Sequence, residues 1–238
     1  MIQLQKQAQE IGIILTEKQI AQFQTYYDRL IETNKVMNLT AITELEEVIS
    51  KHFIDSLLLI QAYPDIAGQK LKVLDLGTGA GFPGIPLKIA FPSLQITLMD
   101  SLNKRVKFLK SVIDELKLCD IEAVHGRAEE AARNTMYREQ FDLCVSRAVA
   151  NLATLSEYTL PFVKIGGMCI PYKAAGVEEE VDTAKKAIQI LGGKLTTVKK
   201  VALPETEIER SFILIDKVKK TPKTYPRKPG TASKEPIH

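Results

Sequence analysis

The chain has 238 residues, a net charge of +3, 45% hydrophobic residues and 26% charged residues. This composition is ordinary for a globular protein and excludes wholesale disorder, collagen and coiled-coil arrays. Three cysteines without a C-x-x-C pair are too few, and odd in number, for a disulfide framework, so we expect reduced thiols in a cytoplasmic protein. The N-terminus has no signal-peptide region, and no uncharged stretch is long enough to cross a membrane.

Basic charge is concentrated at the C-terminus. Residues 217–238 hold seven Lys or Arg and one acid, a net charge of +6, so the rest of the chain carries −3. A basic, Pro-rich tail on a nearly neutral body predicts contact with a polyanion, and the alternative is a solvated, disordered end. We expect three regions, which are an N-terminal helical extension (1–66), an α/β domain (67–218) and a basic Pro-rich tail (219–238).

The N-terminal region is expected to be helical. A capping-box pattern, TEKQ at 16–19, precedes apolar residues at i, i+3 and i+4 spacing, which predicts a helix. A second capping-box pattern, TELE at 43–46, predicts another helix that runs to about Ala62 and ends at Tyr63-Pro64.

From residue 71 onward, strand and helix patterns alternate. The expected strands are 71–76, 94–99, 121–125, 141–146, 168–172, 194–203 and 210–216. The expected helices are 86–91, 103–118, 128–136, 155–162 and 177–191. Such alternation predicts a mostly parallel sheet, and the short spacing of the last two strands predicts an antiparallel hairpin at one edge.

The first strand leads into a glycine-rich loop, VLDLGTGAGFPG. Gly77, Gly79 and Gly81 allow a tight turn and close approach to a ligand. The GAGFPG run formally matches the dinucleotide fingerprint, but Asp75 would repel a pyrophosphate and could instead bind the ammonium group of a methionine moiety. The D-x-G-x-G-x-G pattern therefore resembles the first motif of Rossmann-like methyltransferases and favours S-adenosylmethionine. A dinucleotide or a purely structural turn remains an alternative.

Later strand ends supply further candidates at the same carboxyl edge. Asp100 lies 23 residues after Gly77, near the roughly 20 expected of a ribose-hydroxyl acceptor, or it caps the next helix. Ala128 and Glu129 follow the third strand, where a backbone N–H could bind adenine, or they begin an acidic helix turn. Arg147 follows the fourth strand and could contact a substrate base or phosphate, or form a surface salt bridge.

Missing motifs restrict the acceptor. The polar-Pro-Pro-aromatic motif frequent in exocyclic-amine methyltransferases is absent after the fourth strand, and no Pro-Cys supplies the nucleophile of 5-methylpyrimidine formation. Guanine N7 fits, because it has a lone pair and no proton to remove, although O-methylation remains open.

His52 and Asp55 share a helix face and could form a local pair. No His, Cys and Asp cluster has metal-ligand spacing, so no metal is expected.

Five segments together carry a family resemblance: NLT at 38–40, KHFIDS at 51–56, DLGTGAGFPGIPL at 75–87, SRA at 146–148 and YPRKPG at 225–230. They resemble the glucose-inhibited division protein B family of bacterial guanine-N7 methyltransferases that act on small-subunit ribosomal RNA. The resemblance extends from about residue 16 to 236.

This resemblance implies a class I S-adenosylmethionine-dependent methyltransferase fold with an N-terminal helical extension. It implies methyl transfer to N7 of a specific guanine in 16S rRNA, with the rRNA or the small-subunit particle as partner, no metal and no membrane. Together with the loop residues, the expected cofactor set is Asp75, Gly77, Gly79, Gly81, Phe82, Asp100, Ala128, Glu129 and Arg147. The expected substrate-facing residues are Asn38, His52, Arg147 and Arg227.

No catalytic residue is assigned from the sequence, and we expect a monomer. Aromatic residues are sparse, so a single stacking residue is expected, with Phe82 near the cofactor edge as the candidate. A small-molecule methyltransferase and a noncatalytic ribosome assembly factor are the alternatives. The first would be indifferent to loss of the tail, and the second would bind RNA without methyl transfer.

Overall fold

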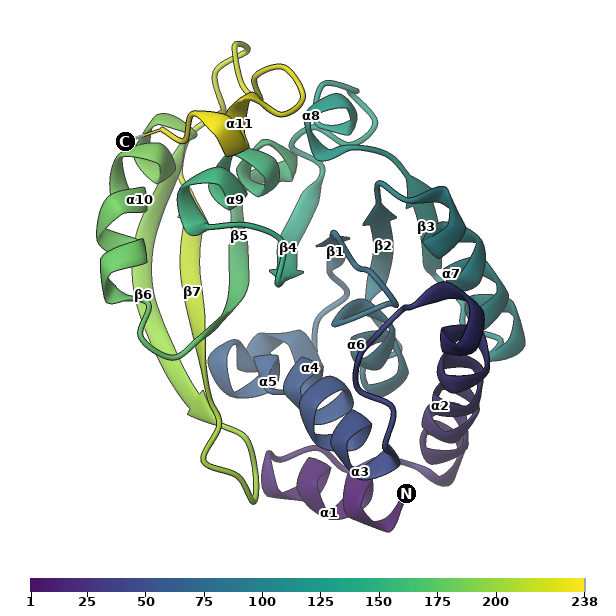
Figure 1. Ribbon diagram of the computed structural model, residues 1–238. Coiled ribbons are helices and arrows are strands. Elements are labelled where there is room, and N and C mark those ends of the chain that lie inside the picture. The colour runs from purple at the N-terminus through teal and green to yellow at the C-terminus, as the bar shows by residue number, and fades with distance from the viewer. Residues whose placement is uncertain (238) are drawn as a thin grey trace.

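A computed structural model describes residues 1–237, which form one seven-stranded sheet in the order β3-β2-β1-β4-β5-β7-β6 (Figure 1). The strands are β1 (Lys72–Leu76), β2 (Gln95–Asp100), β3 (Ile121–His125), β4 (Phe141–Arg147), β5 (Val163–Ala174), β6 (Gly193–Ala202) and β7 (Glu209–Lys217). The first five are parallel, and β7 is antiparallel to both β5 and β6. This confirms the expected α/β class and the final antiparallel hairpin.

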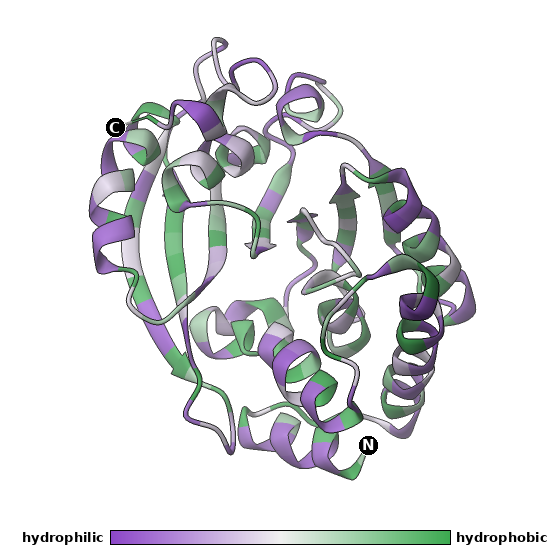
Figure 2. Ribbon diagram, viewed as in Figure 1, coloured by the Kyte–Doolittle hydropathy of each residue, from purple (hydrophilic) through white to green (hydrophobic). Residues whose placement is uncertain are grey.

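Helices cover both faces of the sheet, which explains the nearly continuous apolar character of its central strands. They are α6 (Gly84–Ala90), α7 (Asn103–Glu115), α8 (Ala128–Ala131), α9 (Leu152–Thr159), the 3₁₀ segment η3 (Leu160–Phe162) and α10 (Glu178–Ile190). Val73 of β1 packs in a core with the N-terminal helices, α6 and α7, whereas Leu74 packs in a second core with α9 and α10. Apolar residues accordingly gather along the strands and the inner faces of these helices (Figure 2).

The N-terminal extension packs on one of these two cores. Its elements are α1 (Ile2–Glu10), α2 (Glu17–Met37), α3 (Leu45–Val48), the π-helix η1 (Ile49–Ile54), α4 (Asp55–Leu57), α5 (Leu59–Ala62) and the 3₁₀ segment η2 (Pro64–Ala67). The first capping box is confirmed, since Thr16 Oγ1 accepts the Gln19 N–H at 3.3 Å and Gln19 Oε1 accepts the Thr16 N–H at 2.8 Å.

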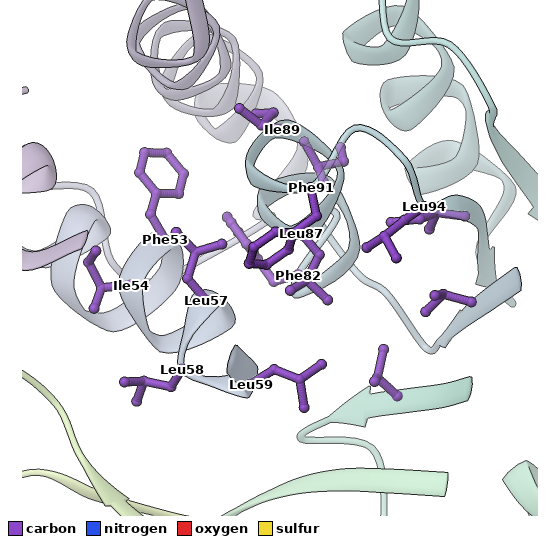
Figure 3. Packing of buried hydrophobic residues seen from close by; sticks show 14 of the residues in the cluster. Phe53, Ile54, Leu57, Leu58, Leu59, Phe82, Leu87, Ile89, Phe91 and Leu94 are labelled. Carbon is purple, nitrogen blue, oxygen red and sulfur yellow. The ribbon is translucent and has the colours of Figure 1, made fainter. Parts of the chain in front are cut away.

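The second predicted helix is not one continuous helix. Its N-cap is Glu44 without a side-chain cap, so the TELE capping box does not form, and the helix is interrupted by η1 and again at Leu58. With the wider π turn, Phe53, Ile54 and Leu57 are all buried in the core (Figure 3). π-Helical turns occur often at functional sites, and this one contains His52.

Three other local predictions need correction. α1 was not predicted, because no capping side chain marks its start and only Leu4, Gln7 and Ala8 of it are buried. α8 is a single turn rather than a helix over 128–136. β5 begins at Val163, before the Gly166-Gly167 pair, because its pairing with β4 shifts register between Phe141 and Leu143.

The C-terminal tail is packed against the protein over its described part, 219–237, and contains a short helix, α11 (Thr231–Lys234) (Figure 1). Arg138 donates hydrogen bonds to the carbonyls of Thr221 and Tyr225, both at 2.9 Å. The alternative of a solvated end is therefore wrong for these residues, whereas His238 lies outside the described part. Within residues 1–237, no helix combines the length and apolar character that a membrane span requires.

Candidate functional site

A cleft of about 340 Å³ opens beside the glycine-rich loop, at the carboxyl ends of β1, β2 and β3. We call it the glycine-loop cleft, and its lining includes Gly77, Asp100, Ala128, Glu129, Val149 and Tyr158. Ligands of open α/β sheets bind at this edge. The structure thus brings together four of the residues expected to bind a cofactor, from three different strand ends.

The backbone of the loop requires glycine at Gly77. Its φ is +70°, and a Cβ there would lie 2.5 Å from Cγ2 of Val149, which lines the same cleft. Gly79 has a φ of +62° with open space around it, and its N–H donates to Asp100 Oδ2 at 3.0 Å. The loop therefore bends tightly around Asp100 and leaves its own backbone open to a ligand.

Asp100 is buried at the end of β2 and fixes the glycine-rich loop by accepting a hydrogen bond from its backbone. Its Oδ1 accepts the Leu102 N–H at 2.8 Å, while its Oδ2 accepts from Gly79. The N-cap of α7 is Leu102, without a side-chain cap, so the alternative of Asp100 as that helix cap is wrong. Arg105 Nη1 is a third donor, 3.5 Å from Oδ2. A carboxylate has about four lone-pair sites, so Asp100 retains capacity to accept one ligand hydroxyl in the cleft.

Asp75 lies beneath the loop, not in the cleft lining. It is 0% exposed, and its Oδ2 accepts from Thr78 Oγ1 at 2.6 Å and from the Gly84 N–H at 2.8 Å. Its Oδ1 has no hydrogen-bond partner among residues 1–237. Burial raises the pKa of Asp75 to about 6, against the opposing effect of these two hydrogen bonds. A buried acceptor without a partner is costly, so Oδ1 is suited to a cationic or water-bridged ligand group.

Other expected cofactor residues lie outside the glycine-loop cleft. These are Asp75, Gly79, Gly81, Phe82 and Arg147. Gly81, with a φ of +107°, allows close packing on Ile85 and the Tyr26 hydroxyl, which is a structural reason for glycine. The predictions missed Val149 and Tyr158. Val149 could have been found, because it follows the end of β4, whereas nothing in the sequence marks Tyr158 near the end of α9.

A second cleft, of about 500 Å³, lies at the ends of β4 and β5, and we call it the basic cleft. Its lining includes Lys51, His52, Asp55, Arg147, Lys173 and Arg210. Asp55 is buried between two guanidinium groups, with Oδ2 2.6 Å from Arg147 Nη1 and Oδ1 2.7 Å from Arg210 Nε. Lys51 and Lys173 pair with Glu47 and Glu180, whereas Arg147 and Arg210 share the single carboxylate of Asp55. The one positive charge left over favours an anionic ligand.

His52 is neutral at neutral pH. Burial, followed by the charge of Arg147, lowers the pKa of His52 to about 4. Its Nδ1 lies 3.1 Å from the Lys51 carbonyl and 3.3 Å from Arg147 Nη2, and its Nε2 lies 2.8 Å from Thr40 Oγ1. The expected His52–Asp55 pair does not form, because the two arginines occupy Asp55.

Phe82 is a core residue, which corrects its expected role as a stacking platform. Its ring stacks on His52 with centroids 4.6 Å apart, packs near Phe53, and lies 5.2 Å from the Arg147 guanidinium carbon. In Figure 3 it lies among the apolar side chains of α6 and the N-terminal helices. Phe82 therefore supports His52 and Arg147 from beneath and is not open to a base.

The remaining two substrate candidates lie apart from the basic cleft lining. Asn38 is exposed at the end of α2 with a φ of 49°, two residues before the Thr40 that contacts His52. Arg227 forms an ion pair with Glu157 of α9, with Nη2 2.7 Å from Oε2. Its expected contact with RNA thus conflicts with an internal pairing that occupies its guanidinium group.

The two clefts meet at one chain segment. Arg147 and Ala148 line the basic cleft, and Val149, the next residue, lines the glycine-loop cleft. A small ligand in one cleft and an anionic ligand in the other would therefore approach each other at the end of β4. No group of three or more His, Cys, Asp or Glu side chains among the described residues could hold a metal ion.

The chain is similar to known proteins over most of its length. The GidB family model, described as rRNA small subunit methyltransferase G, matches residues 19–212. A protein of Lachnoclostridium phytofermentans named ribosomal RNA small subunit methyltransferase G is 57% identical over 227 residues, covering 95% of this chain and 93% of its own. A protein of Alkaliphilus metalliredigens with the same name is 53% identical over 229 residues, covering 96% and 95%.

Solved structures show the same fold at low sequence identity. A SAM-dependent methyltransferase from Aquifex aeolicus has a TM-score of 0.54 at 15% identity, over 75% of this chain and 96% of that one. M. jannaschii TYW2 in complex with AdoMet has a TM-score of 0.52 at 15% identity, over 69% and 77%.

Proposed function

The chain belongs to the rRNA small subunit methyltransferase G family, and we propose that it transfers a methyl group from S-adenosylmethionine to N7 of a guanine in 16S rRNA. The observation that carries this proposal is the junction of the glycine-loop cleft with the basic cleft at residues 147–149. One cleft suits a methyl donor without phosphates, and the other suits a nucleic acid. Acting on rRNA implies a cytoplasmic enzyme, which we propose to be a monomer.

The residues around the glycine-loop cleft fit S-adenosylmethionine. Asp100 can accept a ribose hydroxyl, and the start of α8 at Ala128 and Glu129 borders space for adenine. The unpartnered Oδ1 of Asp75 lies beneath the loop, outside the cleft lining, and can act on the ammonium group through water and through its negative charge. When bound, the cofactor supplies an electrophilic methyl group on a sulfonium. A dinucleotide fits less well, because the buried Asp75 carboxylate beneath the loop would oppose a pyrophosphate.

The chemistry at N7 matches the groups in the basic cleft. The N7 lone pair forms the new bond to the methyl carbon as the carbon–sulfur bond breaks, its electron pair stays on sulfur, and no proton leaves. A general base is therefore unnecessary. His52 is neutral and Asp55 is held by two arginines, so their role is to orient Arg147 toward the acceptor. Alignment of the two reactants then supplies the rate enhancement.

The basic cleft also restricts the form of the RNA. An A-form helix hides guanine N7 in a deep, narrow groove, so the target must come from a loop or an opened structure. Arg147 and Arg210 share one carboxylate, so their surplus positive charge can then meet its phosphates, with an affinity that falls as salt rises.

A labelling experiment tests the proposal. The protein is incubated with labelled S-adenosylmethionine and unmodified 16S rRNA, or small-subunit particles, and N7-methylguanine is mapped by reduction and aniline cleavage. One strong stop is expected. If no label enters the RNA although the protein binds the cofactor measurably, the result would instead favour the small-molecule methyltransferase or the noncatalytic assembly factor.

A further inference from the structure

The C-terminal tail is held beside the glycine-loop cleft by a buried ion pair. Glu157 of α9 is 1% exposed and receives a forked contact from Arg227, with Nε 3.1 Å from both carboxylate oxygens and Nη2 2.7 Å from Oε2. The backbone N–H of Arg227 also donates to Glu157 Oε1 at 2.7 Å. Forked arginine–carboxylate contacts fix geometry as well as adding energy.

Further hydrogen bonds fix the tail on both sides of Arg227. Before it, the Pro226 carbonyl accepts from Arg133 Nη2 at 2.6 Å. After it, the Ala232 carbonyl accepts from Thr154 Oγ1 at 2.9 Å. The donors come from the segment after α8 and from α9, so the tail joins the two elements that form one wall of the glycine-loop cleft.

The inner side of the tail reaches residues that line this cleft. Gly230, with a φ of +81°, directs its N–H to Glu129 Oε1 at 3.0 Å. Glu129 lines the cleft at the start of α8, and Tyr158, the residue after Glu157, lines it from α9. The tail thus holds both elements of this wall, α8 and α9, although it contributes none of the described lining itself.

The charges of the tail divide into two groups. Lys219, Lys220, Lys223, Lys228 and Lys234 are exposed. Arg227 instead points inward to Glu157, and the side chain of Lys217, the last residue of β7 before the tail, is fully buried. The outward lysines are free to meet a polyanion, whereas Arg227 is already neutralised.

We propose that the C-terminal tail is a positioning element of the glycine-loop cleft, in which Arg227 through Glu157, and Gly230 through Glu129, hold α8 and α9 in the geometry that binds S-adenosylmethionine. This inference rests on the proposed function, because it assumes that ligand. Arg227 is a positioning residue in this scheme and has no contact with the reacting atoms. The tail then supports cofactor binding in addition to any contact of its lysines with RNA.

The test measures cofactor and RNA binding separately in matched variants. Arg227→Gln, Glu157→Gln and the double variant are compared with Arg29→Gln, which breaks an Arg–Glu pair between α2 and α7, outside both clefts. Calorimetric titration with S-adenosylmethionine should show a Kd raised about tenfold in each single variant, since a hydrogen bond to a charged group is lost. The double variant should be no worse than the weaker-binding single, because both break one interaction.

Control readouts separate positioning from a structural role. Arg29→Gln should bind S-adenosylmethionine within about twofold of wild type, and Arg227→Gln should bind unmethylated 16S rRNA with unchanged Kd and salt slope. Arg227→Lys, which keeps the charge but loses the fork, should recover part of the cofactor affinity. Unchanged cofactor affinity in folded Arg227→Gln, or a loss of RNA binding alone, would overturn the proposal.

Hydrogen exchange of the wild-type protein gives a second test that needs no variant. S-adenosylmethionine should slow exchange of the Gly230 and Arg227 amides as well as those of α8, because the bound cleft holds the tail in place. Exchange slowed at α8 with the tail amides unaffected would contradict the inference. A wild-type protein that does not bind S-adenosylmethionine would contradict the proposed function instead, so the two failures are distinguishable.

Discussion

Replacement of Gly77 by alanine should weaken cofactor binding in addition to destabilising the fold. The residue has a φ of +70°, so alanine incurs the left-handed backbone penalty of about 1–2 kcal/mol. The new Cβ would also lie 2.5 Å from Cγ2 of Val149, which is closer than two carbon atoms can approach. The perturbation therefore has a backbone component and a side-chain component with different consequences.

The side-chain component acts on the ligand site. Val149 is 40% exposed and lines the glycine-loop cleft, so its side chain can move to relieve the clash, at little cost to stability. The cofactor, however, needs the loop and Val149 where they now stand. We expect Gly77→Ala to lose about 1–2 kcal/mol of unfolding free energy from the backbone, and at least about tenfold in cofactor affinity, which is about 1.4 kcal/mol.

Gly12→Ala is a matched control for the backbone component. Gly12 has a φ of +85° with no atom within 4 Å of its ideal Cβ, and it lies outside both clefts. Urea unfolding should show similar losses for the two variants, whereas calorimetric titration with S-adenosylmethionine should show a loss for Gly77→Ala alone. Wild-type cofactor affinity in a folded Gly77→Ala protein would refute the assignment of this cleft.

Three further predictions concern charge. Because the pKa of Asp75 is about 6, its carboxylate is ionised at neutral pH and becomes protonated as the pH falls below that value. Calorimetry should therefore show weaker S-adenosylmethionine binding as the pH falls through 6, and Asp75→Asn should remove this pH dependence. Asp55→Asn leaves Arg147 beside a second unneutralised guanidinium, so single-turnover methyl transfer should slow by about tenfold or more with cofactor affinity unchanged; equal rates would exclude this positioning role. Lys223→Ala and Lys228→Ala should each reduce the salt slope of RNA binding by about 1 if that lysine meets a phosphate, and an unaltered slope in filter binding would argue against it.

Sequence patterns predicted the fold where local and global preferences agree. The central strands are apolar on both faces and the helices between them are amphipathic, so period alone placed β1 to β4 within two residues. It failed where tertiary contacts decide. The π-helix η1 forms where Phe53 and Ile54 pack into the core. α1 has no side-chain cap and is stabilised by the burial of Leu4 and Ala8 in the same core. Neither packing arrangement leaves a periodic signal.

Site prediction succeeded for residues at strand ends and failed for residues reached by distant segments. Gly77 and Asp100 follow strands, so a parallel sheet brings them to one edge whatever the rest of the fold does. Arg210 contacts Asp55 across 155 positions of the chain, and Glu157 receives Arg227 across 70. These partners depend on the placement of the β6–β7 hairpin and of the tail, which the sequence did not specify at the level of single side chains.

Strain and buried charge converge where the two clefts meet. Ala148 has a φ of +58°, unusual for a residue with a Cβ, and such strain persists only where the surroundings determine it. Its neighbour Arg147 forms an ion pair with Asp55, which also pairs with Arg210. These contacts fix the long, flexible side chain of Arg147 in one position at the end of β4. A buried carboxylate between two guanidinium groups is a poor device for stability, because apolar packing would serve as well. It is an effective device for fixing a cation next to a bound methyl donor, and a reaction that depends on alignment more than on proton transfer needs that kind of rigidity.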